Sequence, residues 1–175
     1  MTTAAITAKP VMDPMLSEFR AEVMITRRVL DRVPAGKLSW KPHPKSMTLG
    51  QLAIHIATVP GSISRISQQD SFDVSKGSFV PPQPKNMDEV QAAFEESVRE
   101  AEKWLTDMTE QQAQAPWRLM FGNKEIFTQP RRSVLRSIML NHWYHHRGQM
   151  SVYLRLLDVP VPVIYGRSAD EGPFG

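Results

Sequence analysis

Four stretches of the chain carry apolar residues at the spacing of an amphipathic helix. Over 13–33, apolar side chains recur every three or four residues, which places them on one face of a helix. The same spacing returns over 48–68, 86–108 and 130–157. Each stretch has about 20 residues and therefore predicts about 30 Å of helix. Four helices of matched length, each with one apolar face, favour an all-α fold, a four-helix bundle.

Prolines mark the connections between these stretches. Proline is costly inside a helix but suits loops and first helical turns. Most of the fourteen prolines therefore separate the predicted helices or lie in the C-terminal tail. Pro60 lies inside the 48–68 stretch, where we expect a kink or a local break. Thr48 and Gln51 have the spacing of a capping box and predict that this helix begins there.

The segments between the predicted helices differ in length. The connection over 71–85 is longer than a tight turn, so an up-down-up-down helix order does not follow from the sequence. The stretch 116–129 has apolar residues on both sides of Gly122-Asn123 and predicts either a short hairpin or a packed loop. We expect residues 1–12 to form a loose tail and residues 13–175 to form a single domain.

Composition narrows the classes of protein to consider. The 175 residues are 41% apolar and 22% charged, as in a globular chain. Cysteine is absent, which excludes disulfides, thiolate metal ligands and a cysteine nucleophile. The net charge is only +3 and the basic residues are scattered, so we expect no nucleic-acid partner. No apolar run is long enough to span a membrane and the N-terminus lacks a signal-peptide pattern, so we expect a cytoplasmic protein without a membrane partner.

Three of the five histidines lie together in the last predicted helix. At about 100° per residue, His142 and His146 lie about 40° apart, one turn from each other. Both fall on the stripe that contains Leu135, Ile138 and Gln149, whereas His145 points about 60° to the other side of His142. His142 and His146 are therefore predicted to point inward.

His55 is the third histidine predicted to point into the fold. It shares a helical face with Leu52, Ile56 and Ile63. Two inward histidines one turn apart, with a third from a neighbouring helix, form the open three-nitrogen set of a catalytic metal site. Such a set suits zinc, nickel or ferrous iron rather than magnesium or calcium. The alternative is that the three are polar residues of the core.

At these positions the sequence resembles the DinB family of damage-inducible-type proteins, the DinB/YfiT-like metalloenzymes. The resemblance rests on Trp40-Lys41-Pro42, on the run from Leu49 to Ala57, and on Asn141 to Gln149, and it covers about Leu16 to Gly166. It implies a four-helix bundle, commonly a homodimer. It also implies a divalent metal, nickel or zinc in many relatives, held by His55, His142 and His146. Some relatives transfer or isomerise substrates with low-molecular-weight thiols.

Two functional hypotheses follow. The first is a metal-dependent transferase or hydrolase that acts on a small-molecule substrate. The resemblance implies use of a low-molecular-weight thiol, and any such thiol must come from a cosubstrate because the chain has no cysteine. The second is a non-catalytic metal-binding or stress-related helical dimer. Arg136 and Arg147 either steer a carboxylate or are solvated at the surface, which is the more usual role. Gln149 is expected to orient a ligand or a metal-binding histidine. No residue stands out as the general base.

Overall fold

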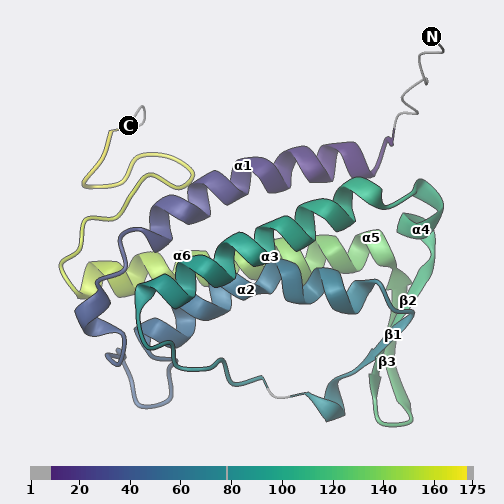
Figure 1. Cartoon of the computed structure of the whole chain (residues 1–175), viewed down its shortest axis with the longest axis horizontal. Helices are drawn as coiled ribbons and strands as arrows, with labels where there is room; N and C mark the ends of the chain where they lie inside the picture. The colour runs from purple at the N-terminus through teal and green to yellow at the C-terminus, as the bar shows by residue number, and fades with distance from the viewer. Residues whose placement is uncertain (1–8, 78, 173–175) are drawn as a thin grey trace.

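The chain is mostly helical in the computed structural model, which describes residues 9–77 and 79–172 (Figure 1). Three long helices are α1 (Met12–Leu30), α2 (Leu49–Ser67) and α3 (Met87–Asp107). A fourth long helical segment consists of α5 (Arg131–Val134), the π-helix η3 (Leu135–Asn141) and α6 (His142–Leu156). The four predicted helical stretches are therefore confirmed, with ends within three residues of those expected. Residues 1–8 of the predicted tail lie outside the described residues.

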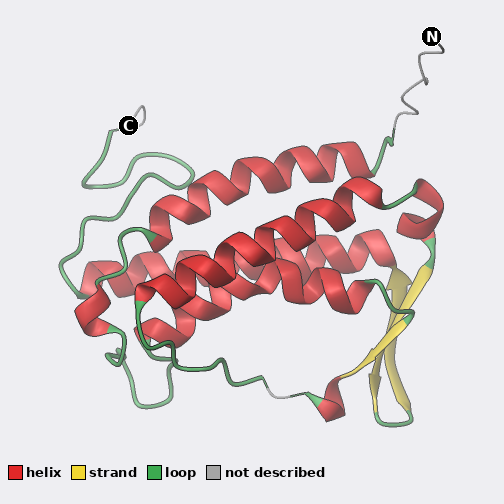
Figure 2. Cartoon of the chain, viewed as in Figure 1, coloured by secondary structure: helices red, strands yellow, loops and turns green. Residues whose placement is uncertain are grey.

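Short elements connect the long helices. They are η1 (Ala35–Lys37), β1 (Ser71–Asp73), η2 (Val74–Lys76), α4 (Glu110–Gln114), β2 (Pro116–Phe121) and β3 (Lys124–Pro130). The three strands form a small sheet at one end of the helices (Figure 2). The predicted all-α class is therefore incomplete.

Helix α2 begins where the capping box predicts. The Thr48 hydroxyl accepts a hydrogen bond from the Gln51 backbone N–H at 3.0 Å, and the Gln51 side chain accepts one from the Thr48 N–H at the same distance. These two bonds satisfy N–H groups that the first helical turn leaves unpaired. The helix then runs through Pro60 to Ser67, so a local break at Pro60 is wrong and a kink there stays a prediction.

Helices α2 and α3 run in the same direction, and α1 and the last helical segment run in the opposite one (Figure 1). The Gly61 N–H donates to the Ser97 hydroxyl at 2.8 Å. Further along both helices, the Trp104 indole donates to the Ser67 hydroxyl at 2.9 Å. A parallel pair of helices requires the chain to return to the starting end, and the connection over 68–86 does so. Its length therefore follows from the helix order.

The sheet joins two distant parts of the chain. Strand β1 pairs with β2 in parallel, and β2 pairs with β3 in antiparallel orientation around a turn at Gly122, which has φ of 57°. The hairpin alternative for 116–129 is therefore confirmed. Trp117 fixes the hairpin to the helices, because its ring is fully buried and its indole donates to the Ile66 carbonyl at 3.3 Å. Strand β1 was not expected from the sequence.

The apolar core lies between the long helices. Phe19 of α1 stacks on Trp143 of α6 with ring centroids 5.6 Å apart, and Phe94 of α3 lies 6.5 Å from the same indole. Leu52 and Leu105 add fully buried side chains from α2 and α3. In the described part of the chain, no helix is both long enough and apolar enough to cross a membrane.

Candidate metal centre

Three histidines from two helices meet with their ring nitrogens together. His55 comes from α2, and His142 and His146 come from the first turns of α6. The His142 Nε2 atom lies 3.0 Å from Nε2 of His55 and 3.1 Å from Nε2 of His146. One nitrogen from each ring lies within 4.8 Å of the others, so the cluster is compact enough to hold a metal ion. The structure thus brings together the three side chains that helical spacing directed inward.

The surroundings favour the neutral form of all three rings. Burial, and then the charges that His146 and His142 would carry, lower the pKa of His55 to about 4. Burial also lowers the pKa of His142, and charge on His146 and His145 adds to the effect. The pKa of His146 is lowered by burial, although its hydrogen bond to Gln149 opposes the shift. Neutral imidazole is the form that binds a metal, so the cluster offers three lone pairs at neutral pH.

Gln149 sets the orientation of His146. Its side-chain Oε1 lies 2.8 Å from Nδ1 of His146, one turn further along α6. An amide oxygen there accepts a hydrogen bond from Nδ1–H, which leaves the lone pair on Nε2, the nitrogen that faces the other histidines. Histidines that bind metals usually have such a partner on the second nitrogen. The position of Gln149 beside a predicted ligand is therefore as the sequence indicated.

Pro60 and Trp143 fix α6 against α2 beside the cluster. Pro60 has no N–H, so the Ile56 carbonyl loses its usual helical partner. The Trp143 indole supplies a replacement, because its Nε1–H donates to the Ile56 carbonyl at 2.8 Å. Ile56 and Trp143 directly follow His55 and His142 in the sequence. This one bond therefore satisfies the carbonyl that Pro60 leaves without a helical partner, and it joins the two helices one residue from each of the two histidines.

The π-helix η3 ends directly before His142. π-Helical turns are rare and occur frequently at functional sites. Their wider turn changes the direction of the side chains that precede it relative to those that follow. Directions calculated at 100° per residue therefore hold from His142 onward, within α6, but not across 135–141.

The arginines near the histidines in the sequence do not reach the cluster. The Arg147 side chain is 1% exposed and pairs with Glu22 of α1 at 2.5 Å, so its expected solvated role is wrong. It also donates to the Thr26 hydroxyl at 2.9 Å. Arg136 is exposed and pairs with Glu18 of α1 at 2.6 Å. Both guanidinium groups thus bind carboxylates of the protein, and neither points to the histidines.

A cavity of about 530 Å³ opens onto the three histidines. Helix α2 forms one wall with side chains that include Ile63. Phe72 of β1, residues 79–82 of the long connection and Leu119 of β2 form others. The cavity therefore lies between α2, which the sequence predicted, and the sheet and long connection. The sequence did not predict how that sheet and connection are arranged.

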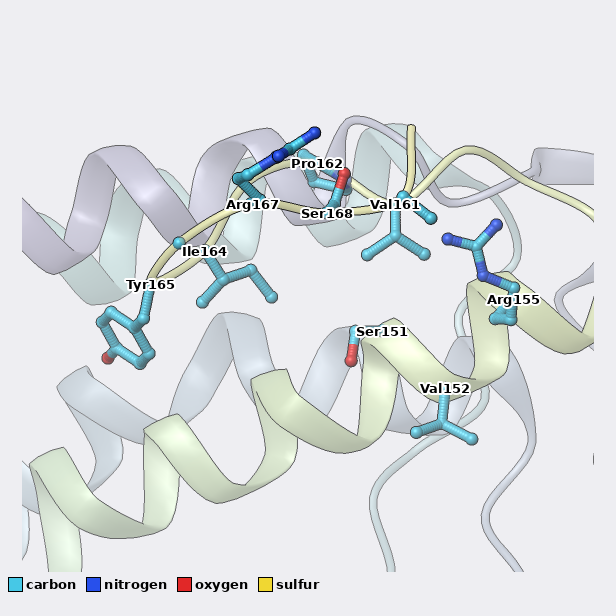
Figure 3. A pocket seen from close by; sticks show the side chains of 11 residues that line it. Ser151, Val152, Arg155, Val161, Pro162, Ile164, Tyr165, Arg167 and Ser168 are labelled. Carbon is cyan, nitrogen blue, oxygen red and sulfur yellow. The ribbon is translucent and has the colours of Figure 1, made fainter. Parts of the chain in front are cut away.

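A second hollow, of about 440 Å³, lies between α6 and the C-terminal tail (Figure 3). Ser151 and Arg155 line it from the helix, and Val161 and Ile164 line it from the tail. The Arg155 guanidinium is already paired with Asp170 at 2.5 Å. Among the described residues, this hollow shares none of its lining with the cavity at the histidines. It is therefore a separate feature, formed where the tail packs on the helix.

Comparison with known proteins gives consistent matches over most of the chain. The model of the DinB family matches residues 4–172. The uncharacterized protein YrdA of Bacillus subtilis (strain 168) is 27% identical over 163 residues, which cover 91% of each chain. A DinB-like protein from Bacillus cereus ATCC 10987 superposes with a TM-score of 0.67 at 24% identity, over 86% of this chain and 95% of that one. A DinB-like protein from Bacillus subtilis gives the same TM-score at 18% identity, over 89% and 99%.

Proposed function

The chain belongs to the DinB family, and on that premise we propose that it is a metal-dependent enzyme of the thiol-dependent transferase or hydrolase type. His55, His142 and His146 bind a divalent transition metal in this proposal. The observation that carries it is the convergence of three imidazole nitrogens within 4.8 Å at the edge of a cavity. We further propose that the four long helical segments form the four-helix bundle of the family.

The donor set supports zinc or nickel as the metal, with iron also accommodated. Three neutral imidazoles suit these borderline ions, whereas magnesium and calcium prefer oxygen ligands. Three protein ligands also leave at least one coordination position for water or substrate, as catalytic sites require. The His55 and His142 rings border the cavity, so an open position on that side would face a molecule bound there.

Other residues of the chain position the proposed metal ligands. Gln149 holds the His146 tautomer, and Trp143 holds the two helices at their separation. A bound metal would supply Lewis acidity toward a water molecule or a thiol. The thiol must come from a cosubstrate because the chain contains no cysteine. A small-molecule substrate and a low-molecular-weight thiol are accordingly the proposed partners, and the homodimer stays a prediction from the resemblance.

One observation favours the alternative, a metal-binding protein without catalysis. Among the described residues that line the cavity, none is an aspartate, glutamate, lysine or arginine. A general acid or base other than the histidines is therefore absent from this lining. A stress-related metal-binding dimer needs no such group, whereas a hydrolase would take its base from metal-bound hydroxide.

Metal content tests the proposal directly. We expect about one zinc or nickel ion per chain in tag-free protein incubated with the metal and then desalted. His142→Ala should lose the ion. His145→Ala is the matched control, because His145 is the next histidine along the same helix and does not belong to the cluster.

The metal contents of His142→Ala and His145→Ala show whether the loss of the ion is specific to the three-histidine cluster. Retention of the ion in His142→Ala, or equal loss in both variants, would refute the three-histidine site. Turnover of thiol conjugates by the loaded wild type, absent in His142→Ala, would then distinguish the enzyme from the binding protein.

A further inference from the structure

We propose that the cavity beside the three histidines binds an uncharged, apolar small molecule, and that this molecule is the body of the substrate. Its role as a substrate rests on the proposed function, whereas the class of ligand rests on the cavity alone. The reacting polar group would face the histidines at one side of the cavity. The remainder of the molecule would contact aliphatic and aromatic side chains.

The size of the cavity fits a small molecule. Ligand pockets in proteins typically enclose about 300–1,000 Å³, and this one encloses about 530 Å³. A single small molecule is therefore the occupant to which the dimensions point.

Away from the histidines, the walls of the cavity are mostly apolar. Ile63 and Ile66 contribute from α2, and Phe72 and Leu119 contribute from the sheet. Pro81 contributes from the long connection. Each such contact gains about 25 cal/mol per Å² of apolar surface removed from water. Binding would thus be driven by burial of the apolar body.

The described lining offers no partner for a charged substituent. The one arginine of α2, Arg65, pairs with Glu100 of α3, and its side chain is 56% exposed. Arg131, at the sheet end, donates to the Ser67 carbonyl at 2.5 Å and to the Gln112 carbonyl at 3.0 Å. An ionised group taken into the cavity away from the histidines would lose its hydration without a counter-ion, which is costly. The walls therefore select against charged molecules.

Two hydroxyls supply limited polarity on the α2 wall. Thr58 and Ser62 line the cavity on the same helix as His55. The Thr58 hydroxyl proton is used by the Ile54 carbonyl at 2.8 Å, so this oxygen can only accept. The Ser62 oxygen accepts from Arg65 at 3.3 Å, which leaves its proton to donate. The ligand can thus carry one neutral acceptor, such as a carbonyl or ether oxygen, near Ser62.

A matched pair of fluorescent probes tests the proposal. N-phenyl-1-naphthylamine is uncharged, and 8-anilino-1-naphthalenesulfonate has the same ring skeleton with an added sulfonate. We expect the uncharged probe to bind metal-free wild type at least about tenfold more tightly than the sulfonate, equivalent to about 1.4 kcal/mol. Equal affinities, or tighter binding of the sulfonate, would overturn the proposed ligand class.

Two pairs of variants place the probe in the cavity. Ile63→Gln and Leu119→Gln put an amide in the wall and should each weaken binding by about tenfold, since each removes apolar surface that the bound molecule would contact. Met24→Gln on α1 and Ile126→Gln on β3 are the controls, because these side chains are 63% and 49% exposed and do not line the cavity. Equal weakening in wall and control variants would overturn the proposal. Thermal unfolding of each variant separates loss of the cavity from loss of the fold.

Metal content measured on the same samples distinguishes this proposal from the proposed function. Ile63→Gln should keep the metal and bind the uncharged probe about tenfold more weakly, whereas wild type freed of metal should still bind that probe. If wild type binds the uncharged probe but takes up no zinc or nickel on incubation, the metal-dependent function is overturned and the ligand class alone is supported. If wild type takes up the metal but does not bind the uncharged probe, the proposed ligand class is overturned and metal binding is supported.

Discussion

Protonation of the three histidines determines how steeply metal affinity falls below neutral pH. Each imidazole must be neutral to bind, and an unperturbed imidazole titrates near 6.5. For three unperturbed histidines, lowering the pH from 7.5 to 5.5 would weaken binding by about tenfold each, or about 1,000-fold in all. In the structure, burial and the other two rings lower the pKa of His55 to about 4. His55 therefore stays neutral at pH 5.5 and adds almost nothing to the loss of metal affinity. The pKa values of His142 and His146 are also lowered, and each contributes less than its tenfold share.

The predicted loss of affinity between pH 7.5 and pH 5.5 is therefore below about 100-fold. Calorimetric titration of the metal-free protein with Ni²⁺ at the two pH values, in buffers that bind the metal weakly, measures it. His145→Ala serves as a control, because His145 lies outside the cluster. A loss of about 1,000-fold or more would refute the argument that the fold suppresses protonation of the ligands.

The same shifts predict the stability of the metal-free protein. Between about pH 4 and 6.5 the unfolded chain holds a proton on His55 that the folded chain does not. Stability must then increase with pH across this range and be lost as the pH falls through it. Thermal unfolding of the metal-free protein at several pH values checks the sign, and a maximum near pH 5 would contradict it.

Three further predictions concern the packing around the site, and urea unfolding of each variant measures them. Gly61→Ala should destabilise the protein by about 1–3 kcal/mol, because a Cβ there would lie 2.9 Å from the backbone of α3, whereas Gly148→Ala meets nothing within 4 Å and should be neutral or stabilising. Trp143→Phe should cost about 1–3 kcal/mol, since it leaves a buried carbonyl of α2 without a donor, and it should also weaken metal binding. Arg147→Met should cost about 3–5 kcal/mol by leaving Glu22 unpaired, and adding Glu22→Met should restore most of that loss.

The helices and the direction of the histidines could be predicted because both depend on local spacing. A period of 3.6 residues places His142 and His146 on one face whatever the rest of the fold does. His55 was found in the same way, from the apolar stripe it shares with Ile56. The capping bonds of Thr48 are local as well, since they join residues three positions apart. Such signals need no knowledge of which helices are neighbours.

The features that the sequence did not reveal depend on residues far apart in the chain. Pro60 was expected to kink or break α2, and the donor that replaces its missing N–H is Trp143, on a different helix. Arg147 was expected at the surface because its buried partner, Glu22, lies 125 residues away. Strand β1 has three residues and exists only through pairing with β2. The π-helix leaves no residue signature that a 3.6-residue period would detect.

The proposed metal ligands and much of the cavity wall that faces them come from different parts of the fold. The proposed ligands lie on α2 and α6, whose faces and contacts are set by the packed helices. Most of the opposite cavity wall comes instead from β1, β2 and residues 79–82 of the connection that returns the chain between the two parallel helices. Loop and hairpin positions tolerate substitution better than helix cores do. Changes at Phe72 or Leu119 can therefore alter which apolar molecule fits while the three histidines, and the Trp143 bond beside them, stay in place.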